Sequence, residues 1–140
     1  GRKTFTLGDF GNGSRMKLVT NHLVAINNVA AGETMVLAMK AGLEPETAWE
    51  IINAGATNRV FDFRGRMMVD NCYVPPTMKI STWAKDMGAI SDLARSLNAP
   101  TPLFNATEAI YGAALANGQG GEDTAAVCRV LERMAGIARD

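Results

Sequence analysis

The sequence predicts an all-α fold, a six-helix bundle around one long central helix. The first sign is a stretch from Arg15 to Ala41 that contains no proline. Between Lys17 and Lys40 the sole charged side chain is Glu33, as expected of a helix buried along most of its circumference. Aromatic residues make up only 6% of the chain while Ala, Gly and Met are plentiful, a composition that favours helix packing over a β-sandwich.

The long helix is expected to run from Gly11 to about Ala41, roughly 40 Å at about 1.5 Å per residue. A glycine-rich turn leads into it, and Gly42 ends it as a glycine beyond the last turn commonly does. Before the turn, Lys3 to Leu7 alternates like a short strand with no second strand to pair with. Because the chain also begins at Gly1 without an initiator methionine, we interpret it as an excised piece of a longer protein.

Two shorter helices are predicted next. Pro45 suits a first turn, so a helix is expected from there to Gly55. A segment from Asn58 to about Val69 follows, broken by Gly65, and residues 70–77 form a loop. The apolar side chains expected to face inward are Ala48, Ile51, Ile52, Val60, Phe61, Phe63, Met67 and Met68.

The second half of the chain predicts three more helices. One runs from about Met78 to Leu97, and the next is capped by Thr101 with Pro102 in its first turn. The last begins at Asp123 or Thr124. The inward positions expected here are Ile80, Trp83, Met87, Ile90, Ala94, Leu97, Leu103, Ala106, Ile110, Tyr111, Ala114, Val127, Val130, Leu131 and Met134.

Composition excludes several classes of protein. Fourteen basic and fourteen acidic side chains cancel, so nothing favours binding to nucleic acid or to an anionic membrane. An apolar share of 47% excludes a disordered chain. The stretch from Leu18 to Met39 is long enough to span a membrane, but five strongly polar side chains argue for a protein interior. These are Asn21, His22, Asn27, Asn28 and Glu33.

The two cysteines and the one histidine indicate no redox or metal chemistry. Cys72 and Cys128 lack a C-x-x-C spacing and are interpreted as ordinary thiols of a reducing compartment, so a cytoplasmic location is expected. No His/Cys/Asp cluster suggests a metal site. His22 lies on the side of the long helix away from Lys17, so it is interpreted as structural.

One narrow stripe of the long helix carries polar groups. At about 100° per residue, Lys17, Asn21, Val24 and Asn28 fall on the same side. Polar groups where burial is costly need partners, and a ligand is one possible partner. The alternative is that both asparagines bond to neighbouring helix ends while the lysine extends to water. The pattern alone leaves both interpretations open.

The start of the helix offers further chemistry. The run G-N-G-S-R-M fails as a dinucleotide fingerprint because Met16 replaces the third glycine, yet its backbone amides still favour an anion. An amine near a positive helix end, partly removed from water, has reason to titrate below its free value, which suits Lys17 to acid–base work. Asn21, one turn on, can hold the substrate or the amine in place.

Other charged residues have two interpretations each. The pair Lys85-Asp86 lies in a largely apolar helix and is either functional or part of a solvated face. Glu33 is assigned a structural hydrogen-bond role. The polar and charged side chains that can line an acid-binding pocket, or simply face water, are Asn58, Arg59, Arg64 and Arg66.

These residues resemble the C-terminal helical domain of the β-hydroxyacid dehydrogenase family, which includes 3-hydroxyisobutyrate dehydrogenase and tartronate semialdehyde reductase, and more distantly 6-phosphogluconate dehydrogenase. The hallmark G-x-G-x-x-x-K-x-x-x-N is matched by Gly11, Gly13, Lys17 and Asn21. The resemblance covers nearly the whole chain in the right order. It is supported by Lys40 to Leu43, Lys85-Asp86, Pro102-Leu103, Tyr111, the glycine-rich link and Asp123.

The resemblance implies a role for each matched residue. Lys17 would be the general acid/base, Asn21 would orient the substrate, and the turn from Gly11 to Gly13 would lie close to it. Lys85 would reach the cofactor, NAD or NADP, or the substrate across an interdomain cleft. The family's Rossmann domain would precede this region, so residues 1–10 are assigned to its end or linker and residues 11–140 to the helical substrate-binding and dimerisation domain.

Two departures from the family's pattern affect the substrate pocket. The first of two asparagines common after the lysine is Thr20 here, and Met78 replaces a common phenylalanine. Phosphosugar-specific positions are not recognisable, so the resemblance implies a small, unphosphorylated 3-hydroxy acid or the corresponding semialdehyde. The fragment alone is expected to be inactive and to form homodimers or higher homo-oligomers. A non-catalytic dimerisation or binding module is the main alternative, and an imine reductase is a third, against which Lys17 counts.

Overall fold

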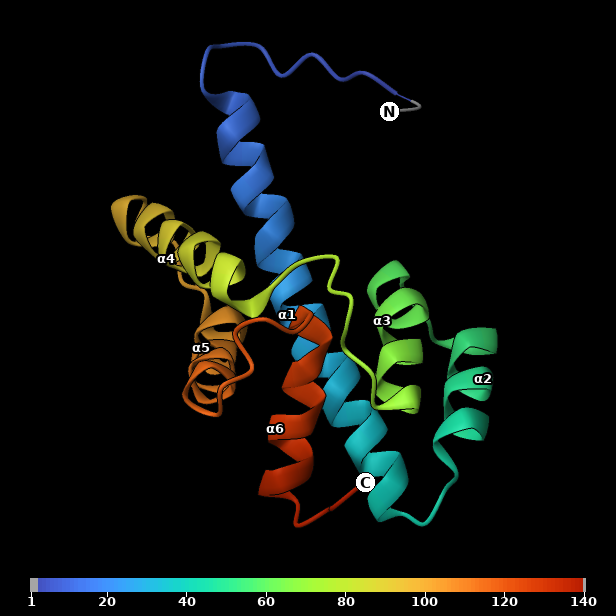
Figure 1. Ribbon diagram of the computed structural model, residues 1–140. Coiled ribbons are helices and arrows are strands. Elements are labelled where there is room, and N and C mark those ends of the chain that lie inside the picture. Colours follow the sequence, from blue (N-terminus) through green and yellow to red (C-terminus); the bar gives the residue numbers. More distant parts are fainter. Residues whose placement is uncertain (1–2, 140) are drawn as a thin grey trace.

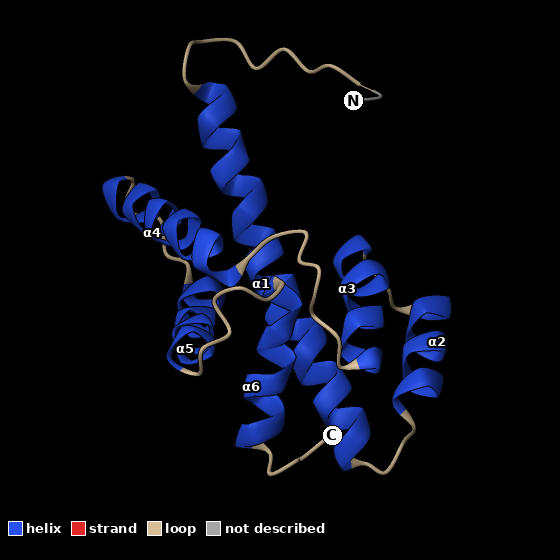
Figure 2. Ribbon diagram, viewed as in Figure 1, coloured by secondary structure: helices blue, strands red, loops and turns tan. Residues whose placement is uncertain are grey.

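The chain folds as the predicted all-α bundle. The computed structural model describes residues 3–139, and within that range it contains six α-helices, one short 3₁₀ helix and no strand. Figure 2 shows that loops connect helix to helix throughout. No helix among these residues combines the length and the apolar character that crossing a membrane requires. The elements are α1 (Asn12–Lys40), α2 (Pro45–Gly55), α3 (Arg59–Asp70), α4 (Ile80–Ser96), α5 (Pro102–Ala116), η1 (Thr124–Ala126) and α6 (Val127–Met134).

Helix α1 is the element that all the others pack against. It contacts each of the other five α-helices, which gather around its C-terminal half (Figure 1). Its fully buried side chains begin only at Ala25 and continue to Ala38. The prediction that α1 is buried along most of its circumference is therefore right for the second half and wrong for the first. The reason is that within residues 3–139 the first half is covered on one side only, by α4 and α5, which contact Asn21 and His22.

Glycine and proline set the helix ends largely as predicted. Gly11 lies just before α1 with φ of +93°, and Gly42 lies beyond its end with φ of +80°, a region that glycine enters without strain. Pro45 and Pro102 occupy the first turns of α2 and α5. Thr101 is the N-cap residue of α5, as predicted, but its hydroxyl bonds to the side chain of Asn105 and not to a backbone amide.

Two local predictions fail in the first half of the chain. Helix α3 runs unbroken through Gly65, because the missing side chain makes room for the ring of Trp49 on α2. Residues 3–7 do not form the predicted strand and have no regular structure. An isolated strand cannot satisfy its backbone hydrogen bonds, and residues 3–139 offer it no partner.

The core lies between the second half of α1 and helices α3 to α6. Most predicted inward positions are buried, among them Phe61, Ile80, Trp83, Tyr111 and Val127. The predicted positions that instead face outward share one feature, which is that no described element covers their side of the helix. They are Ile51, Phe63, Leu97, Leu103, Ala106 and Met134.

Candidate functional site

Three polar side chains meet where the exposed half of α1 passes α4. The Asn21 amide Nδ2 donates a hydrogen bond of 3.2 Å to Oδ2 of Asp86. The Lys17 ammonium lies 3.8 Å from Oδ1 of the same carboxylate. Lys17 and Asn21 are one helical turn apart, so their side chains project to the same side and share one acceptor. The arrangement groups an amine, a carboxamide and a carboxylate at one place on the surface.

The Lys17 amine is more exposed than the sequence predicted. Its side chain is 67% exposed, while that of Asp86 is 22% exposed. The expectation of a partly dried amine fails within residues 3–139, because the contact with Asp86 of α4 leaves most of the Lys17 side chain exposed. In the chain as described, the amine lies on an open face and its carboxylate partner is the more enclosed of the two.

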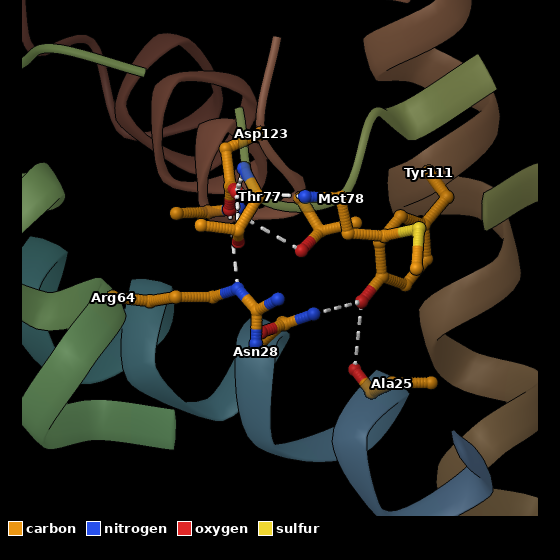
Figure 3. Close-up of polar contacts among 9 residues, drawn as sticks. Ala25, Asn28, Arg64, Thr77, Met78, Tyr111 and Asp123 are labelled. Carbon is orange, nitrogen blue, oxygen red and sulfur yellow. Dashed lines mark hydrogen bonds and ion pairs between the residues drawn. The ribbon is translucent and has the colours of Figure 1, made fainter. Parts of the chain in front are cut away.

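The last residue of the same polar stripe, Asn28, is buried in the core. Asn28 is fully buried, and its Nδ2 donates a hydrogen bond of 3.1 Å to the Tyr111 hydroxyl, which donates in turn to the carbonyl of Ala25 at 3.0 Å (Figure 3). Burial raises the pKa of Tyr111 well above its ordinary value. The stripe that the sequence predicted as continuous therefore divides: Asn28 has a structural partner and Lys17 and Asn21 remain accessible.

A buried aspartate holds the loop that leads into α4. Asp123 accepts hydrogen bonds from the backbone amides of Thr77 and Met78, at 2.8 and 3.2 Å, and from the Thr77 hydroxyl at 2.8 Å (Figure 3). It also pairs with Arg64 of α3, with 3.1 Å from Nε to Oδ1. Because α4 begins at Ile80, this cluster fixes the segment that presents Asp86 to α1.

The electrostatics of that cluster favour an ionised Asp123. Burial by itself would raise the pKa of this carboxyl group, since a charge is poorly solvated away from water. Hydrogen bonds from the Ala125 amide and from Thr77, together with the Arg64 guanidinium, outweigh burial and hold the pKa below its ordinary value. Asp123 is therefore a charged structural residue, consistent with its role as the cap of η1.

The remaining predicted site residues lie around the cluster without joining it. Gly11 and Gly13 lie at the start of α1, and a Cβ atom on either would meet no atom within 4 Å, so the space beside them is open. Lys85 is exposed, and no ion pair to it is found among residues 3–139. The residue that sequence reasoning missed is Asp86. The Lys85-Asp86 pair was singled out, but its pattern did not show which side chain faces α1.

Several alternative assignments are settled by their contacts. The predicted structural hydrogen-bond role of Glu33 is wrong, because its side chain is exposed and makes no such bond within residues 3–139. His22 stacks on Phe104 with ring centres 5.4 Å apart, as expected of a structural residue.

No acid-binding pocket is formed by Arg64 and Arg66, since Arg64 pairs with Asp123 and Arg66 pairs with Glu46 and Asp70. Asn58 caps α3.

The two cysteines are free thiols, Cys72 exposed and Cys128 buried. Burial raises the pKa of Cys128 to about 12, so its thiol stays protonated at neutral pH. Among residues 3–139 no group of three or more His, Cys, Asp and Glu side chains is arranged to hold a metal ion.

The residues present fit an accessory contact to a dinucleotide. Two exposed ammonium groups, Lys17 and Lys85, and the amides at the start of α1 are suited to anionic groups. A pyrophosphate cradle of the strand–turn–helix type needs a strand, and residues 3–139 contain none.

The six-helix fold around a long first helix agrees with the class that the resemblance implied, the helical domain of the β-hydroxyacid dehydrogenases. The family described as NAD-binding of NADP-dependent 3-hydroxyisobutyrate dehydrogenase matches residues 11–131, and the chain belongs to it.

Curated proteins and a solved structure agree. The chain is 32% identical over 133 residues to glyoxylate/succinic semialdehyde reductase 2 of Arabidopsis thaliana, covering 94% of this chain and 37% of the relative. It is 31% identical over 131 residues to L-threonate dehydrogenase of Cupriavidus necator, covering 92% of this chain and 44% of the relative. The crystal structure of 3-hydroxyisobutyrate dehydrogenase from Salmonella typhimurium superposes with a TM-score of 0.81 at 30% identity, over 86% of this chain and 42% of that one. The chain thus spans less than half the length of these relatives.

Proposed function

We propose that the chain is the C-terminal domain of an NAD(P)-dependent dehydrogenase that oxidises a small 3-hydroxy acid or reduces the corresponding semialdehyde or oxo acid. Family membership supports this proposal, since the matching family is described by a dehydrogenase of this kind. The relatives named above are a glyoxylate/succinic semialdehyde reductase and an L-threonate dehydrogenase. The observation that carries the proposal is the Lys17–Asn21–Asp86 cluster on the exposed half of α1.

In the proposed mechanism Lys17 acts as the general acid/base. Its neutral amine takes the proton of the substrate hydroxyl, and its ammonium returns that proton in the reductive direction. When bound, the nicotinamide supplies the hydride acceptor for the adjacent carbon. A carbonyl therefore forms as the O–H and C–H bonds break, and the proton and the hydride leave to different acceptors. A lysine suits this task because the pKa of a lysine falls readily toward neutral pH when its amine is desolvated.

Asn21 and Asp86 are proposed to orient the reacting groups. The amide of Asn21 gives one N–H to Asp86, which leaves the second N–H and the carbonyl Oδ1 for the substrate. The Asp86 carboxylate lies within ionic contact of the Lys17 ammonium and favours its return toward the cluster after each proton transfer. Holding the reacting groups in the right geometry lowers the barrier, because their translational and rotational freedom is lost on binding and not in the reaction step.

The other proposed roles depend on a domain outside this sequence. Gly11 and Gly13 would lie against the substrate, where a side chain would fill the open space beside α1. Lys85 would contact the cofactor or substrate across the cleft. A Rossmann domain, with residues 1–10 as its end or linker, would cover the exposed turns of α1. The whole enzyme is proposed to act in the cytoplasm as a homodimer or higher homo-oligomer, and the helical domain alone to be inactive.

The decisive experiment joins this chain to its own upstream sequence and assays 3-hydroxy acids with NAD and with NADP. We expect Lys17→Ala to lower kcat by roughly 100-fold or more, the scale of a lost general acid/base. Lys79→Ala is the matched control, because Lys79 is also exposed and lies at the start of α4 outside the cluster. Wild-type turnover by the Lys17 variant would refute the assigned base.

The second candidate function is a non-catalytic helical dimerisation or binding module on the same scaffold. The exposure of Lys17, at 67% of its side chain, is the observation that favours it. Nicotinamide cofactor binding by the joined protein separates the two candidates. A protein that self-associates but binds neither NADH nor NADPH in a fluorescence titration is the module, whereas cofactor binding with lysine-dependent turnover is the dehydrogenase.

A further inference from the structure

The glycine-rich link between α5 and η1, residues 118–123, supplies hydrogen-bond acceptors to the start of α4. The backbone amide of Ile80 donates to the carbonyl of Glu122, and that of Ser81 donates to the carbonyl of Gly120, both at 3.0 Å. The first amides of a helix have no partner within the helix itself. Helix α4 has no side-chain cap at its N-terminus, so the link takes the place of that cap.

Asp123, the last residue of the link, holds the residues just before α4. Its carboxylate accepts the amides of Thr77 and Met78, and its own amide donates to the carbonyl of Tyr73 at 2.9 Å. The amide of Thr124 donates to the carbonyl of Met78 at 3.0 Å. Because both the side chain and the backbone of Asp123 take part, the position at which α4 begins is fixed by the link.

The link is itself anchored to two other helices. Gln119 is buried, and its Nε2 donates to a backbone carbonyl of η1 at 3.0 Å. Glu122 pairs with Arg129 of α6 at 2.7 Å, and Asp123 pairs with Arg64 of α3 at 3.1 Å. Both α3 and α6 pack against α1. The link therefore fixes the start of α4 relative to the helix that carries the candidate site.

The contacts of the candidate site tolerate little movement of α4. This helix is unbroken from Ile80 to Ser96, so its start and Asp86 move together. The bond from Asn21 to Asp86, at 3.2 Å, is at the long end of the range for such bonds. The distance from Lys17 to Asp86, at 3.8 Å, is near the limit of about 4 Å for an ion pair. A shift of α4 by about 1 Å away from α1 breaks both contacts, and misplacement on that scale is enough to slow an enzyme.

We propose that the link is a positioning element of the candidate site and that Asp123 is its positioning residue. By setting where α4 begins, the link holds the Asp86 carboxylate within reach of Asn21 and Lys17. Asp123 forms no hydrogen bond or ion pair with any of these three residues and acts on them through α4. The inference rests on the proposed function, because it assigns the link a role in the same site.

The first test uses the joined enzyme and a mild variant, because Asp123→Asn is expected to destabilise the fold. Thr77→Val removes the hydroxyl that donates to Asp123 at 2.8 Å and keeps the shape of the side chain. We expect kcat to fall by about 5-fold or more with KM for the cofactor unchanged, and Thr77→Ser, which keeps the hydroxyl, to restore it. Thr34→Val is the matched control, since Thr34 bonds within α1 and lies about 25 Å along it from Lys17. Wild-type kcat for Thr77→Val, or equal losses for Thr77→Val and Thr77→Ser, overturns the proposal.

A double-mutant cycle tests whether the effect passes through Asp86. In an Asp86→Asn background, Thr77→Val is expected to change kcat by less than about 2-fold, because the carboxylate that the link positions is gone. A purely structural role for the link would give equal factors in both backgrounds, and such additivity overturns the assignment. All rates are measured at a temperature at which circular dichroism shows every variant to be fully folded.

The side chain of Asn21 reports the position of Asp86 without catalysis. Its amide resonances in proton–nitrogen correlation spectra of the 140-residue chain depend on the bond to Asp86. We expect Thr77→Val to move them in the same direction as Asp86→Asn does, and Thr34→Val to leave them in place. Unmoved resonances in the Thr77→Val chain overturn the positioning role. Moved resonances together with wild-type turnover of Lys17→Ala refute the proposed base and support the positioning role.

Discussion

Asn21 of α1 and Asp86 of α4 are 65 residues apart in the sequence and are joined by a hydrogen bond of 3.2 Å. The bond ties the exposed half of α1 to a helix that is itself anchored in the core by Trp83 and Met87. Because Asp86 also contacts the Lys17 ammonium, one carboxylate sets the positions of both proposed site residues. The position of this carboxylate thus depends on the packing of α4.

Asp86 is predicted to matter for catalysis although no residue role was assigned to it from the sequence. In the joined enzyme, Asp86→Asn keeps the size of the side chain but removes the charge beside Lys17 and replaces one acceptor of the Asn21 amide. We expect kcat/KM to fall by about 10-fold or more with the unfolding midpoint unchanged. Asp92→Asn, an exposed position on the same helix, serves as the control. Equal kinetics for both variants would leave Asp86 without a role.

The buried Asp123 predicts a specific dependence of stability on pH. Its folded pKa is below the unfolded value of about 3.9, so ionised Asp123 contributes stability at higher pH that is lost as pH falls from about 4 through the folded pKa. Asp123→Asn removes this contribution, and its stability should change less with pH in that window. At neutral pH it should unfold more easily by about 3–5 kcal/mol, because Arg64 loses its partner.

Urea unfolding between pH 3 and pH 7 measures these differences. Thr77→Val is the milder variant, since it removes a single hydrogen bond to Asp123 and keeps the Arg64 pair. Asp92→Asn is again the control, because its exposed pair with Arg95 contributes little. Parallel pH profiles for the wild type and the Asp123 and Thr77 variants would contradict the assigned electrostatics.

Gly65 is predicted to be required for the packing of α2 on α3. A Cβ at this position would lie 2.7 Å from Cδ1 and 2.9 Å from Nε1 of Trp49, closer than real contacts allow. We expect Gly65→Ala to lower the free energy of unfolding by about 1–3 kcal/mol, as overpacking does. Gly88→Ala on α4 meets no atom within 4 Å and should stabilise the chain by up to about 1 kcal/mol. Thermal or urea unfolding of the pair distinguishes a packing effect from helix propensity.

Most of the fold could be predicted because local chemistry decides it. Gly42, Pro45 and Pro102 act through their own backbone restrictions, so they mark helix ends whatever surrounds them. Gly65 was predicted to break α3 because glycine lowers helix propensity. In the structure its missing side chain makes room for the ring of Trp49, 16 residues earlier in the sequence. Burial was predicted less well, since periodicity shows that a side is apolar and not whether another element covers it, as Leu103 and Met134 illustrate.

The candidate site, too, could be predicted from the sequence only in part. The spacing of Lys17 and Asn21 placed them together correctly, because four residues make one helical turn. The contact with Asp86 could not be read from spacing, since it depends on how α4 crosses α1 after the loop that Asp123 holds. The exposure of Lys17 was missed for a further reason: a long, nearly uncharged helix suggested burial over its whole length, but α4 and α5 meet its first half on one side only.

The unequal covering of α1 has a consequence for the proposed two-domain enzyme. Backbone hydrogen bonds in its first turns lie at the surface of the described chain, and such bonds open most readily. We expect any domain that binds over those turns to stabilise their closed form, because it binds that form and not the opened one. Docking of the domain and ordering of the Lys17 amine are then linked equilibria. Assembly of the two domains would then act as the step that prepares the proton acceptor.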